Sequence, residues 1–455
     1  MAHIVCVTLG YTGMLNTTLA LAKQLEQAGH RITYASPDDL KERLIAQGFA
    51  YVQLERDLPA ARLPLSWWEK LRTVRSRQQQ AVKTLGVENG SQNFGQKMRS
   101  LSPDLLLIHN EMHAHIMAAV AAQIPTALLC SFLSVWRRSN LPPIHSRVVP
   151  GEGWRGQWLG IQWTWLRYSW RKWKEYQRDR WQQAGVDRIS ILRCYAQQIG
   201  HPFPSRFGFT QWLVPYPHDQ LPVLCMNALE MDFPHVPHPS MHYIGPTIRE
   251  DRPEPQVAGS TYEALEQIFK KRRSSPERCL IYCGCSTFVK GSQQRLQKII
   301  EAVSTRPHWD LVVGLGGQLS PEQLGASLPQ NVHAFTWAPA LQILQQADCA
   351  VMDAGINAIR ECVQAGVPML LYSRGHDDQN GNQARAVYHR LALTGDQSKD
   401  DAIKVRSHIQ TLLTDTAYQN EVRNMRDRCC RYSDEKRAAQ IVEALLKSIY
   451  QEAVL

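Results

Sequence analysis

The sequence predicts an α/β chain made of two similar halves, each containing a parallel β-sheet. Short apolar runs alternate with helical patterns in residues 1–235, and the same alternation returns in residues 276–435. A proline-rich stretch separates the two halves. Strands that alternate with helices form parallel sheets, whose ligands bind at the carboxyl ends of the strands. With 455 residues, the chain is long enough for two or three domains.

The first half, residues 1–235, opens with a strand, a glycine loop and a helix. An apolar run from residue 3 to residue 9 ends at Gly10 and Gly13. The residues that follow have apolar side chains at helical spacing until Gly29, where we expect the helix to end. Further strands are expected at RITYAS, SPDLLLIHN and IPTALLCSF, and a helix at AHIMAAVAAQ. This half therefore has the order of strands and helices that is typical of a nucleotide-binding domain.

The second half repeats this order of strands and helices after a predicted linker at residues 236–275, where prolines recur. Residues 276–435 are predicted to form the second domain, and residues 436–455 have the pattern of an amphipathic helix. The second domain is expected to start at RCLIYCGCST, and DLVVGLGG, NVHAFTW, CAVMD and PMLLY are expected to follow as strands.

Charge and cysteine content narrow the class of protein. The formal net charge is +10, but the basic residues are spread out and the chain has no zinc-finger, homeodomain or RNA-platform motif. Nucleic-acid binding is therefore not predicted, and a diphosphate or a membrane surface accounts for the charge equally well. The 11 cysteines are an odd number and are scattered, which indicates reduced thiols rather than a disulfide framework. Cys279, Cys283 and Cys285 lack a second ligand pair at zinc spacing, so no metal site is expected.

The location predicted from sequence is cytoplasmic. The amino-terminal residues lack a basic region followed by a long apolar core, and they fit a first strand better than a signal peptide. No uninterrupted apolar run approaches the roughly 18–20 residues that span a bilayer.

The stretch from Trp337 to Gln379 contains the strongest functional signal. An apolar strand leads into the turn Asp353–Asn357 and then into a helix that carries Glu361. The turn places backbone N–H groups at a helix N-terminus, where a diphosphate is favoured. A carboxylate one helical turn further on can accept hydrogen bonds from ribose hydroxyls. A second apolar run ends near Asp378 and Gln379, which can do the same for a sugar.

This order resembles the donor-binding motif of family 1 glycosyltransferases, the UDP-sugar enzymes of the GT-B fold, and is most similar to bacterial carotenoid and natural-product glucosyltransferases. The resemblance implies two Rossmann-like domains facing a central cleft, with the last helix crossing back to the first domain. It also implies inverting transfer of a sugar, with glucose expected, from a UDP-sugar to an apolar or aromatic small molecule, without a metal or other cofactor. The positions that match the motif are Trp337, Pro339, Leu341, Leu344, Gly355, Asn357, Glu361, Gly366, Val367, Pro368, Met369, Asp378 and Gln379.

The resemblance also implies a role for each donor position. Trp337 would stack on the uracil, Glu361 would bind the ribose, and Asp378 with Gln379 would bind the sugar hydroxyls. The diphosphate would be held by Ser286, Thr287, Gly355, Ile356 and Asn357.

Three donor positions depart from the family pattern. Ala340 stands where the family has Gln, Asp353 where it has His, and Ala358 where it has Thr. The change at Asp353 matters most, because a carboxylate beside a diphosphate is repulsive unless it is protonated, turned away or paired.

The catalytic positions depart as well. The family base is a His in the first glycine loop, where this chain has Gly13 followed by Met14. The Asp that orients this base falls at His109, or at Asn110 with a one-residue slip. His109, with Glu111 nearby, is the candidate replacement base. The acceptor side is predicted to include Gly13, Met14 and Trp136.

Other interpretations remain open. A nitrogen nucleophile or an already ionised acceptor needs no base, and Met14 would then be an apolar wall of the acceptor site. A catalytically silent GT-B protein could act as partner or activator of a true transferase. An enzyme of the same fold could instead carry out other nucleotide-linked chemistry near Asp353.

A tryptophan-rich segment, residues 154–181, stands apart from these motifs. Trp163, Leu166, Trp170 and Trp173 share one helical face, and arginines and lysines surround it. Such a helix suits a membrane interface or a large apolar acceptor. Peripheral contact with the inner membrane face through residues 154–181 is therefore one expectation, and packing of the tryptophans onto the first domain is the alternative.

Overall fold

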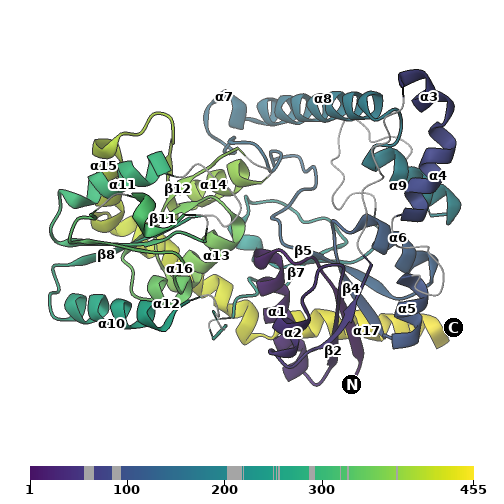
Figure 1. Ribbon diagram of the computed structural model, residues 1–455, viewed down its shortest axis with the longest axis horizontal. Coiled ribbons are helices and arrows are strands. Elements are labelled where there is room, and N and C mark those ends of the chain that lie inside the picture. Colours follow the sequence, from purple (N-terminus) through teal and green to yellow (C-terminus); the bar gives the residue numbers. More distant parts are fainter. Residues whose placement is uncertain are drawn as a thin grey trace.

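The computed structural model contains two α/β domains that lie side by side, each built around a parallel sheet (Figure 1). Helices cover both faces of each sheet, which confirms the predicted fold class of two Rossmann-like domains. The structure describes residues 1–55, 66–84, 94–201, 218, 220–249, 251–252, 254, 257–285, 293–317, 319–324, 327–375 and 378–454.

The first sheet has the strand order β3-β2-β1-β4-β5-β6-β7, and all its pairs are parallel. Every residue of β1, β4 and β5 is buried, as expected for strands covered by helices on both faces. The strands are β1 (His3–Val7), β2 (Arg31–Ser36), β3 (Ala50–Gln53), β4 (Leu105–His109), β5 (Thr126–Cys130), β6 (Val223–Cys225) and β7 (Met241–Tyr243).

The helices of the first domain lie between and beyond these strands. The longest of them is α8, which has 25 residues. They are α1 (Thr12–Gln27), α2 (Lys41–Ile45), α3 (Trp67–Arg72), α4 (Val74–Thr84), α5 (Phe94–Leu101), α6 (His113–Ala121), α7 (Gly153–Gly156), α8 (Trp158–Gln182) and α9 (Arg188–Gln198), with a short 3-10 turn at Leu229–Met231.

The second sheet has the order β10-β9-β8-β11-β12-β13 and is also parallel throughout. Its strands are β8 (Cys279–Gly284), β9 (Trp309–Gly314), β10 (Val332–Phe335), β11 (Cys349–Asp353), β12 (Met369–Tyr372) and β13 (Ala392–Gly395). Its helices are α10 (Gly259–Arg273), α11 (Gln293–Ser304), α12 (Ala340–Leu344), α13 (Ile356–Ala365), α14 (Gln379–Tyr388), α15 (Ala402–Thr414) and α16 (Thr416–Asp434), with a 3-10 turn at Pro321–Leu324.

The linker predicted at residues 236–275 is too wide. β7 pairs with β6 and so belongs to the first sheet. At the other end, α10 packs Leu265 and Phe269 against the second domain around Leu280. Pro237 and Pro239 lie just before β7 and Pro246 follows it, and the passage between the domains lies between β7 and α10.

The last helix, α17 (Arg437–Val454), returns to the first domain and lies along α1 (Figure 1). Ala438, Ala439, Val442 and Leu446 are buried in the same apolar cluster as Leu15 and Leu25 of α1. Between α16 and α17, Lys436 has a φ of 50°, which turns the chain into the new direction.

A buried ion pair between one side chain of each domain also fixes the contact between the domains. Arg385 of α14 pairs with Asp232 at 2.5 Å, and both side chains are almost fully inaccessible. Asp232 also accepts the backbone N–H of Ser134, which comes from the loop after β5. This ion pair therefore ties α14 to the carboxyl edge of the first sheet.

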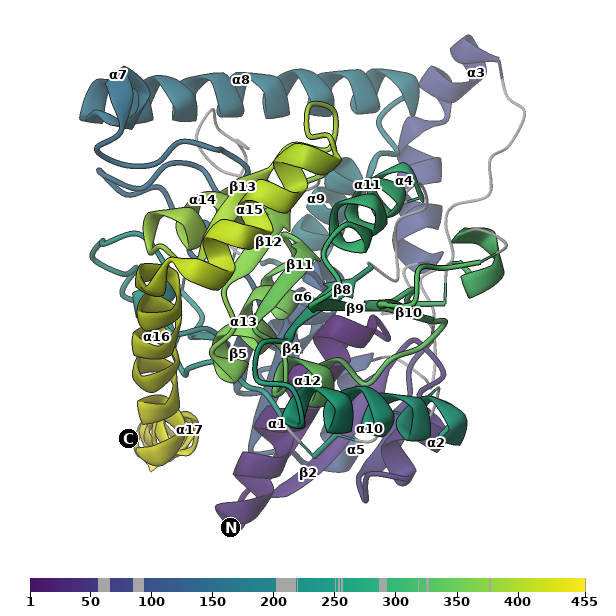
Figure 2. The ribbon, with the colours of Figure 1, turned by 90° about the vertical axis from the view of Figure 1, so that its left-hand side faces the viewer.

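The tryptophan-rich segment spans α7 and α8, which lie along the upper edge of the molecule in two perpendicular views (Figures 1 and 2). Of its seven tryptophans only Trp165 is buried, and its indole N–H donates to the carbonyl of Leu141. Packing onto the first domain therefore buries Trp165, while the other six tryptophans stay partly or largely exposed. Across the part of the chain that the structure describes, no helix is long and apolar enough to span a bilayer. All 11 cysteines are free thiols.

Candidate active site

The two sheets bring together a glycine loop from each domain. After β1, the loop that contains Gly10 leads into α1, whose second residue is Gly13, and after β11, the turn Asp353–Gly355 leads into α13. A Cβ atom at Gly13 would clash with the side chain of Asn357 in the first turn of α13. The absence of a side chain at Gly13 thus allows the two helix N-termini to approach each other.

Arg360 makes the contact between these helices polar. Its side chain is fully buried and donates to the carbonyl of Met226, to the hydroxyl of Thr17 and to the side-chain oxygen of Asn357. Burial lowers the pKa of Arg360 to about 10, so the guanidinium is still charged at neutral pH. The guanidinium of Arg360 therefore places a buried positive charge of the second domain against the first domain. It lies in the helix that follows the predicted diphosphate turn.

Asp353, which stands where the family pattern has His, is paired with two arginines. Its carboxylate accepts from Arg295 at 2.5 Å and from Arg374 at 3.2 Å, and all three side chains are less than one-tenth exposed. Burial alone would lower the pKa of Arg295, but the carboxylate of Asp353 outweighs burial and raises it. The Arg295–Asp353–Arg374 cluster therefore has a net charge of about +1, and the expected repulsion of a diphosphate is removed by pairing.

Glu361, the predicted ribose ligand, faces the passage between the domains. Its carboxylate accepts from Arg252 at 2.5 Å, and Arg252 also contacts Glu254 at 2.7 Å. Burial would lower the pKa of Arg252, but the carboxylates of Glu361 and Glu254 outweigh burial and raise it. The space beside this pair has a volume of only about 30 Å³ and is lined by Gly13, Asn16, Thr17, Asn357, Arg360 and Glu361 together with residues Thr247–Arg249 and Arg252.

The sugar end of the motif lies at the carboxyl end of β12. Asp378 accepts from the side-chain amide of Asn382 at 2.8 Å. Gln379 begins α14, and its side-chain oxygen accepts the backbone N–H of Arg374 at 2.9 Å. Gln379 and the Asp353 cluster are therefore joined through one residue, Arg374.

Trp337 follows β10 and is half-buried, with its indole ring against the backbone of Gly317. Gly317 has a φ of 72°, and a Cβ atom there would clash with the ring. Pro339 and Ala340 then start α12. A partly exposed indole fixed by a glycine on one side is suitable for stacking on a base.

Gly355 is the residue before α13, and Ile356 is its first residue, largely buried. The sheet therefore brings Trp337, Asp353, Gly355, Glu361 and Gln379 to its carboxyl edge. Ser286 and Thr287, the other predicted diphosphate ligands, lie outside the described residues.

The predicted acceptor residues are less open than expected. Met14 is half-buried in the first turn of α1, beside Gly13. Trp136 is only 3 % exposed and stacks on His238, with ring centroids 4.0 Å apart. Trp136 is therefore part of the packed interior and does not line an open acceptor pocket in this structure.

His109 ends β4 at the carboxyl edge of the first sheet, where the candidate base was expected, but the side chain is fully buried. Its Nδ1 accepts the backbone N–H of Glu111 at 3.4 Å. Burial lowers the pKa of His109 to about 4, so the ring is neutral at pH 7. A general base must come within hydrogen-bonding distance of the acceptor, and His109 can do so only if the side chains that cover it move.

Glu111 follows His109 on the loop before α6 and is half-buried. Its backbone carbonyl accepts from Arg188 at 3.1 Å. The pair His109 and Glu111 is thus close in space through the backbone of the loop.

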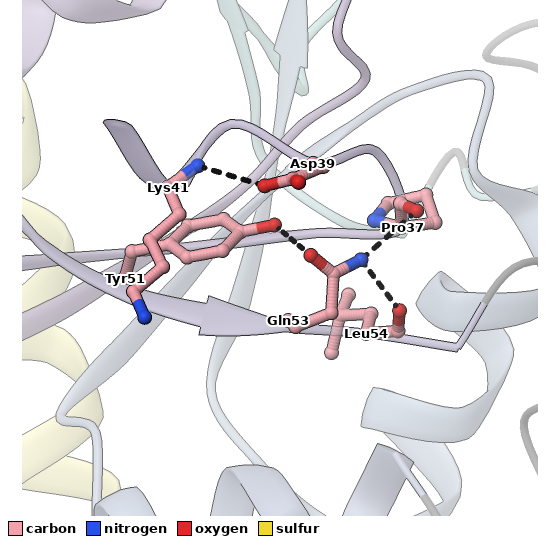
Figure 3. Close-up of a pocket in the computed structure, with 6 residues that line it drawn as sticks. All are labelled: Pro37, Asp39, Lys41, Tyr51, Gln53 and Leu54. Atoms are coloured by element: carbon pink, nitrogen blue, oxygen red, sulfur yellow. Dashed lines mark hydrogen bonds between the residues drawn. The ribbon is translucent and has the colours of Figure 1, made fainter. Parts of the chain in front are cut away.

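A separate hollow lies elsewhere on the first domain, after β2 and around β3 (Figure 3). Its volume is about 740 Å³. Its polar groups mostly bond one another: Tyr51 donates to Gln53, and Gln53 donates to the carbonyls of Pro37 and Leu54 (Figure 3). It contains none of the predicted site residues, and we place the chemistry at the two glycine loops instead.

Sequence reasoning did not identify the four arginines of the site, which are Arg252, Arg295, Arg360 and Arg374. One signal was present for Arg360, which falls at helical spacing with the apolar residues Ile356, Ile359 and Val363. A charged residue on the buried face of a helix is unusual and indicates a buried partner.

Comparison with known proteins agrees with this geometry. The sequence profile described as "UDP-glucoronosyl and UDP-glucosyl transferase" matches residues 218–428. Oleandomycin glycosyltransferase from Streptomyces antibioticus is 24 % identical over 463 aligned residues, which cover 99 % of this chain and 92 % of that protein.

Two solved structures share the fold over nearly their full length. The glycosyltransferase of kitacinnamycin has a TM-score of 0.65 at 19 % identity, covering 98 % of this chain and 99 % of that one. The glycosyltransferase VinC in complex with dTDP has a TM-score of 0.59 at 16 % identity, covering 99 % of this chain and 100 % of that one. The chain is therefore a glycosyltransferase of the GT-B fold, and its residues 218–428 match the model of the UDP-glucuronosyl and UDP-glucosyl transferase family.

Proposed function

We propose that this glycosyltransferase transfers glucose from UDP-glucose, with inversion at the anomeric carbon and without a metal, to an apolar or aromatic small molecule. Transfer of a sugar from a nucleotide sugar to a small-molecule acceptor follows from the family. The choice of UDP and glucose rests on the retained positions Trp337, Glu361, Asp378 and Gln379, which the fold brings to one edge of the second sheet.

The observation that carries the proposal is the pairing of Asp353 with Arg295 and Arg374. An unpaired acid at this turn would repel a diphosphate. With two arginines on one carboxylate, the cluster has a net positive charge beside the N-terminus of α13, whose first backbone N–H groups lack helical partners. Arg374 can therefore supply the positive charge at the leaving group, where the family pattern has His.

Donor binding requires a rearrangement at Glu361. A space of about 30 Å³ holds roughly one water molecule, which is far less than a nucleotide sugar needs. The ribose hydroxyls must displace Arg252 from Glu361, and the contact between α1 and α13 must loosen. The two loops therefore have to move apart to admit a donor.

For proton removal, His109 and an acceptor that needs no base remain the two routes. The complete burial of His109 favours the second route, in which a nitrogen or an ionised oxygen attacks the anomeric carbon and Met14 lines the acceptor side. A cytoplasmic location fits this use of nucleotide-sugar donors.

A transfer assay tests the proposal. The protein is incubated with UDP-glucose, or in parallel with dTDP-glucose, and a panel of phenols, aromatic amines and long-chain alcohols, and product is measured by mass spectrometry. We expect glucosylation with UDP-glucose and a β-linked product by the anomeric proton coupling. Transfer only from the thymidine donor would refute the UDP assignment, and an α-linked product would refute inversion.

A further inference from the structure

We propose that the outer face of α8, together with α3, docks the enzyme on the surface of an anionic lipid bilayer. This inference does not depend on which donor or acceptor the enzyme uses. It rests on exposed apolar side chains, on their arrangement along one edge, and on the charge beside them.

The first observation is an exposed apolar row along α8. Leu159, Trp163, Leu166, Trp170, Trp173 and Trp181 recur at spacings of three, four and eight residues, all of which return to one face of a helix. These six side chains are 38–73 % exposed. Exposed tryptophans at this density are unusual on a soluble surface, where contiguous apolar patches mark interaction sites.

The second observation is that α3 continues this row. Trp67, Trp68 and Leu71 of α3 are exposed, and Trp67 contacts Trp181 with ring centroids 6.1 Å apart. Both helices lie at the upper edge of the molecule in the two perpendicular views (Figures 1 and 2). A helix of 25 residues is about 37 Å long, so the row can lie flat on a planar surface over its whole length.

The positive charge of α8 favours an anionic bilayer as the partner of this surface. The helix contains six basic and two acidic residues, and Arg167, Arg171, Lys174 and Arg178 are exposed beside the row. The ammonium of Lys174 lies over the Trp170 ring at 3.5 Å from its centroid. Indole rings beside basic side chains match the headgroup region of an anionic bilayer. A second copy of the chain would bring two such basic helices together, which like charges oppose.

The buried face of α8 places this surface close to the donor site. Trp165 donates to the carbonyl of Leu141, in the segment between β5 and α7. In the same segment, Arg147 donates to Asn380 at 2.9 Å, and Asn380 follows Gln379 of the sugar end. A docked α8 would therefore be connected to the sugar end of the proposed donor site through the segment that holds Leu141 and Arg147.

Vesicle binding tests the inference. The full chain is sedimented with vesicles of phosphatidylcholine alone and of phosphatidylcholine mixed equally with phosphatidylglycerol, at low and high salt. We expect binding to the anionic vesicles that weakens as salt rises, because screening reduces the attraction of the basic side chains. No sedimentation with anionic vesicles would overturn the inference.

Two variants and two matched controls locate the surface. Trp163→Gln/Trp170→Gln should weaken binding by about tenfold or more. Arg167→Gln/Lys174→Gln should weaken it by about thirtyfold, since each basic residue near an anionic surface contributes about 1 kcal/mol. The controls replace two exposed apolar or two exposed basic side chains of other elements by glutamine. They are Val236→Gln/Ile403→Gln and Lys270→Gln/Lys404→Gln.

The controls should bind as the wild type does, and thermal unfolding should show that all four proteins are folded. Wild-type binding by both α8 variants would contradict the inference. Light scattering tests whether a second copy of the chain binds this face instead. If the protein is a stable dimer without lipid, and Trp163→Gln/Trp170→Gln converts it to a monomer, the row belongs to a dimer interface. That result would overturn the membrane proposal.

Discussion

Replacing Arg374 by Gln tests whether the arginines at Asp353 hold the donor diphosphate. Arg374 reaches Asp353 at 3.2 Å, while Arg295 reaches the same carboxylate at 2.5 Å. The variant keeps the shorter ion pair, so Asp353 still has a buried partner, but the net charge of the cluster falls from about +1 to about 0. The fold should therefore survive while the attraction for a diphosphate is lost.

The size of the effect follows from the bond that is removed. A hydrogen bond to a charged group contributes about 1.5–3 kcal/mol, which corresponds to a roughly 10- to 150-fold change in a dissociation constant. The dissociation constant of UDP should rise by this factor in Arg374→Gln. Uridine has no phosphate, and its affinity should be unchanged.

Calorimetric titration with UDP and with uridine provides the comparison. Arg278→Gln is the matched control, because Arg278 also pairs with a buried carboxylate of the second domain, Asp310, at 2.6 Å and at the opposite end of the strands. The control should bind UDP as the wild type does. If Arg374→Gln binds UDP with wild-type affinity, or loses uridine and UDP binding equally, the assignment of Arg374 to the diphosphate is refuted.

Three further predictions concern His109 and Arg252. His109→Gln should leave kcat/KM within about threefold of the wild type with a nitrogen acceptor, whereas loss of a true general base costs about 100- to 10,000-fold; steady-state kinetics decide between the two. Arg252→Ala frees Glu361 and should lower the dissociation constant of UDP-glucose by up to about fivefold, since a partly exposed ion pair contributes about 0.2–1 kcal/mol; weaker binding would show that Arg252 itself holds the donor. Burial lowers the pKa of His109 and of His115 to about 4 from a usual 6.5, so the unfolded chain binds more protons than the folded one between these values. The free energy of unfolding should be unaffected by these rings above pH 6.5 and fall by up to about 3 kcal/mol for each as pH drops to 4; a chemical-denaturation series with His115→Phe should show a shallower fall, and an identical slope would contradict the assignment.

The sheets, and the positions that meet at the edge proposed as the donor site, could be predicted because their physical signals are local. Strands covered on both faces are continuous apolar runs, and β11 and β12 could therefore be located without the structure. In a parallel sheet, the residues after such strands meet at one edge. This is why Glu361 and Gln379 could be placed in the same site although separate elements carry them.

The electrostatic partners could not be predicted because they depend on contacts between distant segments. Arg295 and Asp353 are separated by 58 positions, and an arginine on an amphipathic helix has the same pattern whether it faces solvent or a buried acid. Only the packing of α11 against the second sheet shows that Arg295 points inward. Arg252 likewise meets Glu361 through the passage between the domains.

The tryptophan row of α8 shows a different limit. Helical spacing shows which tryptophans share a face, but it does not show which face is covered. In the structure, Ile161, Trp165 and Tyr168 face inward, and the row that includes Trp163 and Trp170 faces outward. Similarly, the strand-end position of His109 was predictable, but its complete burial depends on side chains from several elements.

The central claim is that one edge of the second sheet is a working donor site. This edge carries Trp337, the Asp353 cluster, Glu361 and Gln379. Calorimetric titration of the wild-type protein with UDP-glucose tests the claim most directly. Our account predicts saturable binding of one UDP-glucose per chain, weakened by Glu361→Gln through loss of the ribose contact. Absence of binding to UDP-glucose at millimolar concentration, or binding that Glu361→Gln leaves unchanged, would contradict it.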